Sequence, residues 1–135
     1  MNTRAKGSRP YDPRKVTEAD VLKAVKQLLE AKGFRCFRRN TGAVRATYTS
    51  TRTGKKSERF VRFSEPGMAD LWGWAPEQRL GGFLGKHFEI EIKAPKKRPS
   101  LEQQGWLEFA YNGGCIAFWA DSVEMAEAKL KEWGL

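Results

Sequence analysis

The sequence predicts an α/β fold in which helices flank a mixed β-sheet. Stretches with apolar residues at helical spacing are interspersed with short stretches of β-branched, aromatic or alternating residues. The predicted order is a helix, several strands, a helix, a strand and a final helix, which is typical of a sheet sandwiched between helices. With 135 residues, the chain is long enough for one hydrophobic core and too short for two ordinary domains.

The first 15 residues differ in composition from the rest of the chain. They include Gly, Ser, two prolines and five basic residues, which is too little apolar material to form a core. We therefore expect residues 1–15 to form a basic flexible arm and residues 16–135 to form a single domain.

The first helix is expected to begin at Thr17. Thr17 and Asp20 have the spacing of a capping box, and apolar residues then recur at helical spacing as far as Leu29. Gly33 suits the end of this helix, because glycine readily adopts the left-handed conformation that often follows a last helical turn.

Three strands are predicted next. Residues 34–39 form the first, and residues 44–50 and 57–63 form a hairpin around the turn signal Thr53-Gly54-Lys55. Further along, residues 68–74 and 86–93 are predicted strands, joined by a loop that contains Pro and Gly.

The C-terminal third predicts two helices around one strand. Ser100 is expected to cap a helix that ends at Gly113, and residues 115–120 form a strand. Asp121 with Glu124 then predicts a capping box for the final helix. The expected inward stripe of that helix consists of Val123, Ala126, Leu130 and Trp133.

Composition argues against several classes of protein. A membrane-spanning helix needs about 18 consecutive apolar residues, and no stretch of the sequence approaches this length. The polar N-terminus lacks the apolar segment of a secretory signal. We therefore expect a soluble, cytoplasmic protein. Cys36 and Cys115 lack C-x-x-C spacing, which favours buried free thiols. His87 is the only histidine, so imidazole-rich metal sites are not expected, and we interpret it as an exposed residue.

The charge of +9 is unevenly distributed. Residues 1–64 carry 17 basic and 5 acidic residues, whereas residues 65–135 carry 8 and 11. This asymmetry predicts a surface that binds a polyanion such as a nucleic acid, and a separate acidic site. A basic surface that only keeps the protein in solution is the alternative. The expected DNA-binding residues are Arg38, Arg39, Arg45, Arg52, Lys55, Lys56, Arg59, Arg62, Lys96 and Lys97.

The candidate chemistry lies in the predicted strand that ends at Lys93. Alternation places Glu89, Glu91 and Lys93 on one face of this strand. A single E-x-K triplet is a weak signal, but Asp70 lies about twenty residues earlier, in a second predicted strand. If the two strands pair, their carboxylates can bind one cation, and oxygen ligands with few histidines suit Mg²⁺ or Mn²⁺. Gly67 would allow a tight turn before Asp70.

Three ordered motifs resemble the VRR-NUC branch of the PD-(D/E)-x-K nucleases. They are Gly67-Met68-Ala69-Asp70-Leu71, Glu91-Ile92-Lys93 and the run from Leu101 to Leu107. Phe37 to Gly42 and Phe60 to Phe63 also resemble small stand-alone members, many of them phage-encoded. Ala69 stands where the superfamily motif has proline. The likeness covers about residues 17–130.

The resemblance implies a restriction-endonuclease-like αβββαβ core with an added β-hairpin. It also implies that Asp70, Glu91 and the backbone carbonyl of Ile92 hold Mg²⁺ or Mn²⁺ against a scissile phosphate, with no organic cofactor. Lys93 would position the attacking water or neutralise charge that develops on the phosphate. The alternative for Lys93 is a surface ion pair with Glu91.

Two further residues are candidates for the site. Gln103 shares a helical stripe with Trp106 and matches the glutamine of the family pattern, although it could instead close the helix start in a capping box with Ser100. Gln104 is the substitute if the register is shifted by one. Glu18 would add an acidic group from the first helix, or only a favourable charge in its first turn.

The expected function is that of a metal-dependent DNA endonuclease, with Holliday-junction or branched DNA as the leading substrate. Flap, sequence-tolerant and restriction-type endonucleases are alternatives, as is a non-catalytic DNA-binding module on an eroded nuclease fold. Resolving a four-way junction takes two symmetric nicks, so we expect a homodimer; the alternative is a monomer that makes single nicks. A phage-encoded member would act in the cytoplasm of its host.

Overall fold

The main sheet of the protein has four strands in the order β1-β4-β5-β6. The computed structural model describes residues 15–40, 43–62, 64–76 and 85–135. Residues 1–14 of the expected arm and most of the expected loop between β4 and β5 therefore lie outside the described residues. The four strands of the sheet are β1 (Arg35–Arg38), β4 (Leu71–Pro76), β5 (Gly85–Ile92) and β6 (Ile116–Ala120).

Strand directions make this sheet mixed. β1 pairs with β4 and β4 pairs with β5 in antiparallel fashion, whereas β5 and β6 are parallel. The parallel pair is joined by a crossover through helix α2 (Leu101–Asn112), as parallel strands require. The predicted α/β class and the mixed sheet are confirmed.

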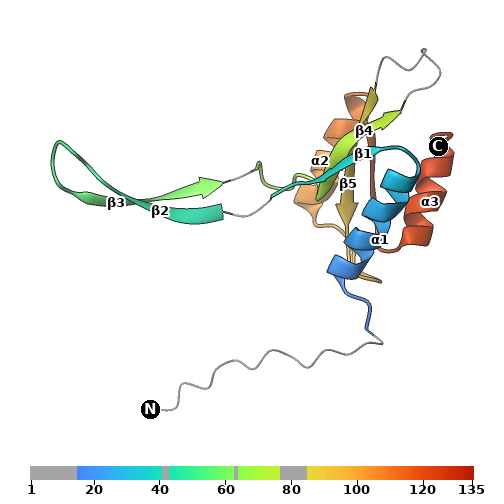
Figure 1. Ribbon diagram of the computed structural model, residues 1–135, viewed down its shortest axis with the longest axis horizontal. Coiled ribbons are helices and arrows are strands. Elements are labelled where there is room, and N and C mark those ends of the chain that lie inside the picture. Colours follow the sequence, from blue (N-terminus) through green and yellow to red (C-terminus); the bar gives the residue numbers. More distant parts are fainter. Residues whose placement is uncertain (1–14, 41–42, 63, 77–84) are drawn as a thin grey trace.

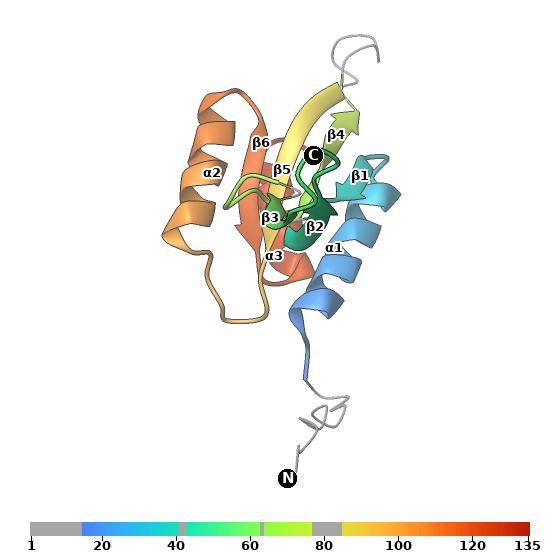
Figure 2. The same ribbon diagram turned by 90° about the vertical axis from the view of Figure 1, so that its left-hand side faces the viewer.

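Helices cover both faces of the sheet. Helix α1 (Glu18–Ala31) and helix α3 (Val123–Glu132) pack against each other and against strands of the sheet. Figure 2 shows α2 and α1 on opposite sides of the sheet. The apolar core lies between the sheet and the α1–α3 layer. Its fully buried side chains include Val25, Leu29, Leu71, Phe88, Ile90, Ile92, Ile116 and Leu130.

Two of the three predicted helix starts are confirmed. Thr17 and Asp20 form a capping box at α1, and Ser100 and Gln103 form one at α2. The third prediction is wrong by one residue. Ser122 caps α3, because its side chain accepts a hydrogen bond from the Met125 backbone N–H.

Asp121, the residue expected to cap α3, has a different partner. Its Oδ2 accepts a bond of 3.1 Å from the backbone N–H of Lys96. This contact ties the loop after β5 to the end of β6. A cap and a loop tether use the same kind of carboxylate, so local spacing could not separate them.

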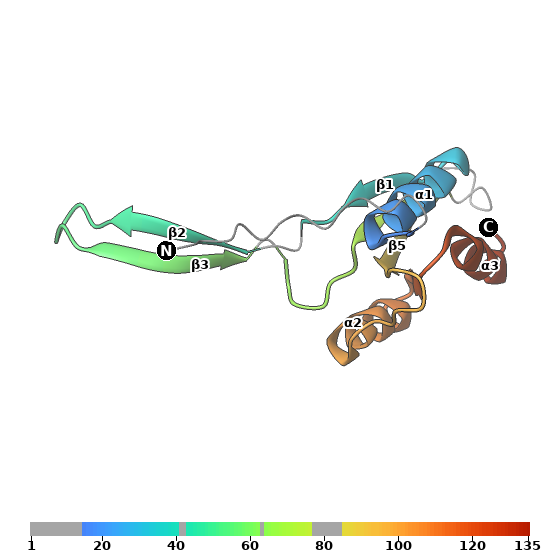
Figure 3. The same cartoon turned by 90° about the horizontal axis from the view of Figure 1, so that it is seen from below.

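Strands β2 (Ala43–Thr49) and β3 (Lys56–Arg62) form a separate two-stranded sheet. They pair antiparallel over seven residue pairs, from Ala43↔Arg62 to Thr49↔Lys56. The hairpin predicted around Gly54 is confirmed, with Gly54 in the left-handed region at φ +67°. Figures 1 and 3 show this ribbon extending away from the main sheet and its helices.

The ribbon is inserted between two adjacent strands of the main sheet. Without it, the order of elements is α1-β1-β4-β5-α2-β6, followed by α3.

Cys36 is buried, Cys115 is half-buried, and both are free cysteines. None of the helices in the described residues is both long and apolar enough to cross a membrane.

Candidate active site

Strand β5 supplies the framework of the candidate site. Phe88, Ile90 and Ile92 are fully buried in the core, while Glu89 and Glu91 point to the opposite face, toward α2, where they contact its side chains. The predicted alternation is therefore confirmed. The two glutamates are nevertheless only 3% and 2% exposed, and they are the buried charged residues of the described chain.

Asp70 lies in a bend directly before β4, not within a strand as expected. Because Leu71 pairs with Ile90 in an antiparallel register, Asp70 lies beside the end of β5. Its Oδ2 accepts a hydrogen bond of 2.9 Å from the backbone N–H of Ile92. The two segments that were expected to pair, around Asp70 and Glu91, do lie side by side. The hydrogen bond between Asp70 and Ile92, however, is made by the Asp70 side chain and not by its backbone.

Gly67 shapes the turn that leads to Asp70, as predicted. Its φ is +82°, a conformation that favours glycine. A Cβ built at this position would lie 2.7 Å from the backbone oxygen of Glu102. The turn before Asp70 and the first turn of α2 are therefore in contact that leaves no room for a side chain.

Glu91 is the centre of the site. Its Oε1 accepts a bond of 2.7 Å from Gln103 Nε2 and lies 3.3 Å from Lys93 Nζ. Its Oε2 is buried and has no hydrogen-bond partner in the described part of the chain. Burial and then the nearby charge of Asp70 raise the pKa of Glu91 to about 7, and the charge of Lys93 opposes this shift.

Gln103 does both things that the sequence suggested as alternatives. Its Oε1 accepts from the backbone N–H of Ser100 at 2.9 Å and closes the capping box. Its Nε2 donates to Glu91. One amide can do both because its oxygen accepts while its nitrogen donates. Gln104, the substitute candidate, instead donates to the carbonyl oxygen of Pro99 at 3.0 Å.

Glu89 is held by a second set of contacts on the same face. Arg39 Nη1 donates to Glu89 Oε2 at 2.9 Å and to the carbonyl oxygen of Ala69 at 2.9 Å. Trp106 Nε1 donates to Glu89 Oε1 at 3.2 Å. Arg39 also donates its backbone N–H to the carbonyl oxygen of Asp70 at 2.7 Å. Arg39 therefore links β5 directly to the bend that carries Asp70.

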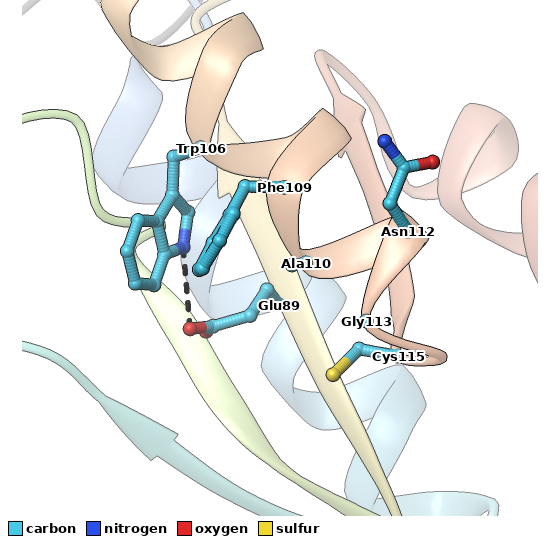
Figure 4. A pocket seen from close by; sticks show the side chains of 7 residues that line it. All are labelled: Glu89, Trp106, Phe109, Ala110, Asn112, Gly113 and Cys115. Carbon is cyan, nitrogen blue, oxygen red and sulfur yellow. Dashed lines mark hydrogen bonds between the residues drawn. The ribbon is translucent and has the colours of Figure 1, made fainter.

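Helix α2 and strand β5 are matched in spacing. Gln103 and Trp106 are three residues apart on one helix face, and their partners Glu91 and Glu89 are two apart on one strand face. The helix therefore runs opposite to β5 and places one donor on each glutamate. Figure 4 shows the Trp106 indole directed at Glu89, with Phe109 beside it.

A groove of about 380 Å³ lies beside Glu89 and α2. Its wall is mainly apolar, and Phe109 is 71% exposed there. Trp106 and Phe109 form a tilted ring pair with centroids 5.8 Å apart. The residues that line the groove are Glu89, Trp106, Phe109, Ala110, Asn112, Gly113 and Cys115 (Figure 4).

The structure brings Asp70, Glu91, Ile92, Lys93 and Gln103 together. Glu18, by contrast, is an exposed residue at the start of α1. The hydrogen bonds and ion pairs around the two carboxylates do not include Glu18 in the described part of the chain.

The predicted DNA-binding residues fall into three groups. Arg39 forms an ion pair with Glu89 and its side chain is only 13% exposed, whereas an exposed phosphate contact was expected. The side chain of Arg62 lies outside the described residues. The others are exposed: Arg38, Arg45, Arg52, Lys55, Lys56, Arg59, Lys96 and Lys97.

Sequence reasoning missed the supporting roles of Arg39, Glu89 and Trp106. Glu89 shares a strand face with Glu91, and this alternation was the available signal for it. Arg39 and Glu89 are 50 residues apart, so no local pattern joins them. His87 is 45% exposed and 3.7 Å from Glu89 Oε1, in keeping with its interpretation as an exposed residue.

The donor set at the site is small. The described residues contain no group of three or more His, Cys, Asp or Glu that could hold a metal ion. Asp70 and Glu91 thus form a two-carboxylate centre that would need backbone or solvent oxygens to complete the coordination of a cation. Comparisons of the chain with protein-family profiles and with curated protein sequences give no significant match.

Proposed function

We propose that this protein is a metal-dependent DNA endonuclease that hydrolyses phosphodiester bonds at the centre formed by Asp70, Glu91 and Lys93. The observation that carries the proposal is Glu91 Oε2, a buried carboxylate oxygen that has no hydrogen-bond donor among the described residues and lies beside a second carboxylate. Two carboxylates side by side share either a proton or a cation. A nuclease centre of this kind uses the cation.

The residues present fit a hard divalent cation. Asp70 Oδ2 and Glu91 Oε2 offer carboxylate oxygens, and the backbone of Ile92 adjoins both residues. The Ile92 carbonyl oxygen is the proposed third ligand. Oxygen donors without histidine suit Mg²⁺ or Mn²⁺. When bound, such a cation supplies charge neutralisation at the scissile phosphate and activation of water.

The chain's own side chains have separate tasks in this proposal. Lys93 is 16% exposed and stays beside Glu91, where its ammonium group stabilises negative charge that develops on the phosphate. Gln103 fixes the rotamer of Glu91 from α2. Arg39 and Glu89 hold the Asp70 bend against β5 and act as positioning residues.

The alternative, in which Lys93 and Glu91 form only a surface ion pair, fits these contacts less well. Glu91 is 2% exposed, and burying a carboxylate costs more than an exposed pair with lysine returns. A non-catalytic DNA-binding module has no use for such a centre. These costs support an enzyme over an eroded fold that only binds DNA.

The same contacts support a place in the VRR-NUC branch of the PD-(D/E)-x-K nucleases. The order α1-β1-β4-β5-α2-β6 corresponds to the αβββαβ core expected of that superfamily. Within this proposal the substrate is branched DNA such as a Holliday junction. Flap, sequence-tolerant and restriction-type endonucleases remain the alternatives.

A homodimer would supply the two symmetric nicks that a four-way junction needs. Exposed aromatic residues offer material for its interface, with Phe37 and Trp74 each 43% exposed and in contact with each other. Light scattering at micromolar concentration should give twice the mass of 15.4 kDa. A 15.4 kDa species that makes only single nicks would contradict the dimeric resolvase and leave the nuclease proposal standing.

The central test is cleavage of labelled duplex, flap and four-way-junction DNA with Mg²⁺, Mn²⁺ or EDTA. Cleavage should need the divalent cation, and the four-way junction should be the preferred substrate. Asp70→Asn and Glu91→Gln should each abolish cleavage while DNA binding stays intact or tightens, since each change removes a ligand and a repulsive charge. Glu124→Gln, an exposed change in α3, is the matched control. Undiminished cleavage by either site variant would refute the proposal.

A further inference from the structure

Among the side chains that the structure describes, the β2–β3 ribbon contains no buried residue. Its described side chains are exposed or half-buried, and Tyr48 is 52% exposed. An isolated two-stranded hairpin is marginally stable in water. The seven residue pairs give a ribbon on the order of 20 Å long, at about 3.3 Å per residue. Figure 1 shows it projecting from the body of the protein. A structure of this kind is suited to binding a partner.

The charge of the ribbon indicates the chemistry of that partner. Between Ala43 and Arg62 the sequence has six basic residues and one acidic residue, Glu58. The same segment contains six Ser and Thr residues, whose hydroxyl groups donate hydrogen bonds to phosphate. A polyanion with regularly spaced phosphates complements this surface.

The tip of the ribbon is ordered by its own hydrogen bonds. Ser50 Oγ accepts from the backbone N–H groups of Arg52 and Thr53, both at 3.3 Å. The backbone N–H of Ser50 donates to the carbonyl oxygen of Lys55 at 2.9 Å. The exposed side chains of Arg52 and Lys55 are thereby carried on a defined turn, which reduces the entropy lost on binding.

Basic residues occupy both faces of the ribbon. The register places Lys56 on one face and Arg59, three residues later, on the other. Arg52 and Lys55 lie at the tip between them. A ribbon that lay flat on a single phosphate backbone would need only one basic face. Cations on both faces and at the tip suit a ribbon with phosphates on either side, as in a groove.

We propose that β2 and β3 form an arm that enters the major groove of duplex DNA, with its two faces toward the two phosphate walls. The major groove, about 12 Å wide, admits a two-stranded ribbon, whereas the minor groove is about half as wide. The inference rests on the proposed action on DNA, and it names the element that grips the duplex beside the cleavage site.

The first test measures binding of a labelled 20-base-pair duplex to the full chain in EDTA, over a series of salt concentrations. Arg52→Ala with Lys55→Ala tests the tip, and Lys56→Ala with Arg59→Ala tests the two faces. Each double variant should weaken binding about tenfold or more and flatten the slope of log affinity against log salt by about 0.9 per lost contact. Lys129→Ala with Lys131→Ala, in α3, removes the same charge and should change the slope little.

Arg52→Lys with Lys55→Arg keeps the tip charges and should bind DNA as the wild type does, which would show that binding depends on the charge at the tip. If the tip and face variants bind duplex DNA as the α3 control does, the arm is refuted. A loss of binding to single-stranded DNA with duplex binding unchanged also refutes it.

The second test identifies the groove. Dimethyl sulfate methylates guanine N7 in the major groove and adenine N3 in the minor groove. The wild-type protein should protect N7 positions, and the tip variant should lose that protection. Protection of adenine N3 alone, or of neither position, overturns the groove assignment. Both tests omit divalent cations and so measure binding apart from cleavage. N7 protection by a protein that cleaves no DNA when Mg²⁺ or Mn²⁺ is added would sink the nuclease proposal and leave the arm in place.

Discussion

The candidate site and the β2–β3 ribbon are stabilised in opposite ways. At the site, three separate elements converge: β5 carries Glu91, the bend before β4 carries Asp70, and α2 contributes Gln103. The ribbon is held by the ladder between its own two strands and by the bonds of its turn. The site is thus fixed by contacts between residues distant in sequence, and the ribbon by contacts within it.

In the proposed function, this difference would separate catalysis from DNA binding. Chemistry needs atoms held within a fraction of an ångström, which buried contacts from several directions supply. Binding to a regular polyanion needs charge and reach, and exposed cations supply both. Substitutions at the site should therefore change rate and stability strongly, while substitutions in the ribbon should change DNA affinity and leave the fold intact.

The largest expected effect is on catalysis, from Lys93→Ala. The variant should fold and still bind a divalent cation, yet lose cleavage by about a hundredfold to a thousandfold, because its ammonium group acts mainly on the transition state. Single-turnover cleavage with Mg²⁺ measures the loss, and Lys131→Ala, an exposed lysine in α3, serves as the control. A loss of only twofold would return Lys93 to a surface ion pair with Glu91.

The next effect is on stability, from Gly67→Ala. The added Cβ would meet the Glu102 backbone oxygen, and φ is +82°, so the free energy of unfolding should fall by about 2 to 4 kcal/mol. Gly105→Ala is the matched control within α2, where nothing lies within 4 Å of the added Cβ. That change should stabilise the helix by about 0.5 to 1 kcal/mol. Equal thermal shifts in the two variants would contradict this packing.

A pH-dependent effect is expected for Glu91→Gln in EDTA. Burial and Asp70 raise the pKa of Glu91 from 4.5 to about 7 in the folded protein. Well below pH 4.5 Glu91 is protonated in both the folded and the unfolded state, so its burial does not lower the free energy of unfolding. As the pH rises toward 7 the unfolded chain releases this proton first, so the folded wild type loses stability, by up to about 3 kcal/mol.

Glu91→Gln has no carboxyl group that titrates at this position. The difference in melting temperature between this variant and the wild type should therefore grow in favour of the variant, from near zero at pH 4 to a maximum above pH 7. Mg²⁺ should then stabilise the wild type and not the variant. A difference in melting temperature that stays constant with pH would show that Glu91 titrates normally.

The smallest effect on stability is expected in the ribbon. Tyr48→Ala removes a side chain that is 52% exposed and should change the free energy of unfolding by less than about 0.5 kcal/mol. Leu71→Ala, in the core of the main sheet, should cost about 2 to 5 kcal/mol. Denaturation of the two variants in urea gives both values. A large loss from Tyr48→Ala would mean that the ribbon supports the body of the protein.

Much of the fold could be predicted from the sequence because its signals are local. Helix caps, the turn at Gly54 and the alternation along β5 depend on residues within a few positions of each other. The same locality explains the error at α3. Asp121 and Ser122 are adjacent and both suit a cap, and the tie from Asp121 to Lys96 spans 25 residues.

The core of the candidate site could be predicted, but not its supports. Asp70, Glu91, Lys93 and Gln103 were expected together, and they are together. The role of Arg39 could not be predicted, since a lone arginine in a basic region suggests phosphate binding. Only the pairing of β1 with β4 brings it to Ala69 and Glu89.

The hydrogen bond from the Ile92 backbone N–H to Asp70 Oδ2 makes this amide a spectroscopic reporter. A cation drawn to Asp70 withdraws electron density from the oxygen that the amide contacts, so the ¹H–¹⁵N signal of Ile92 should move on titration with Mg²⁺. Amides in the ribbon should not move in the same titration. A single backbone resonance can thus follow occupancy of the site in a protein that carries no substrate.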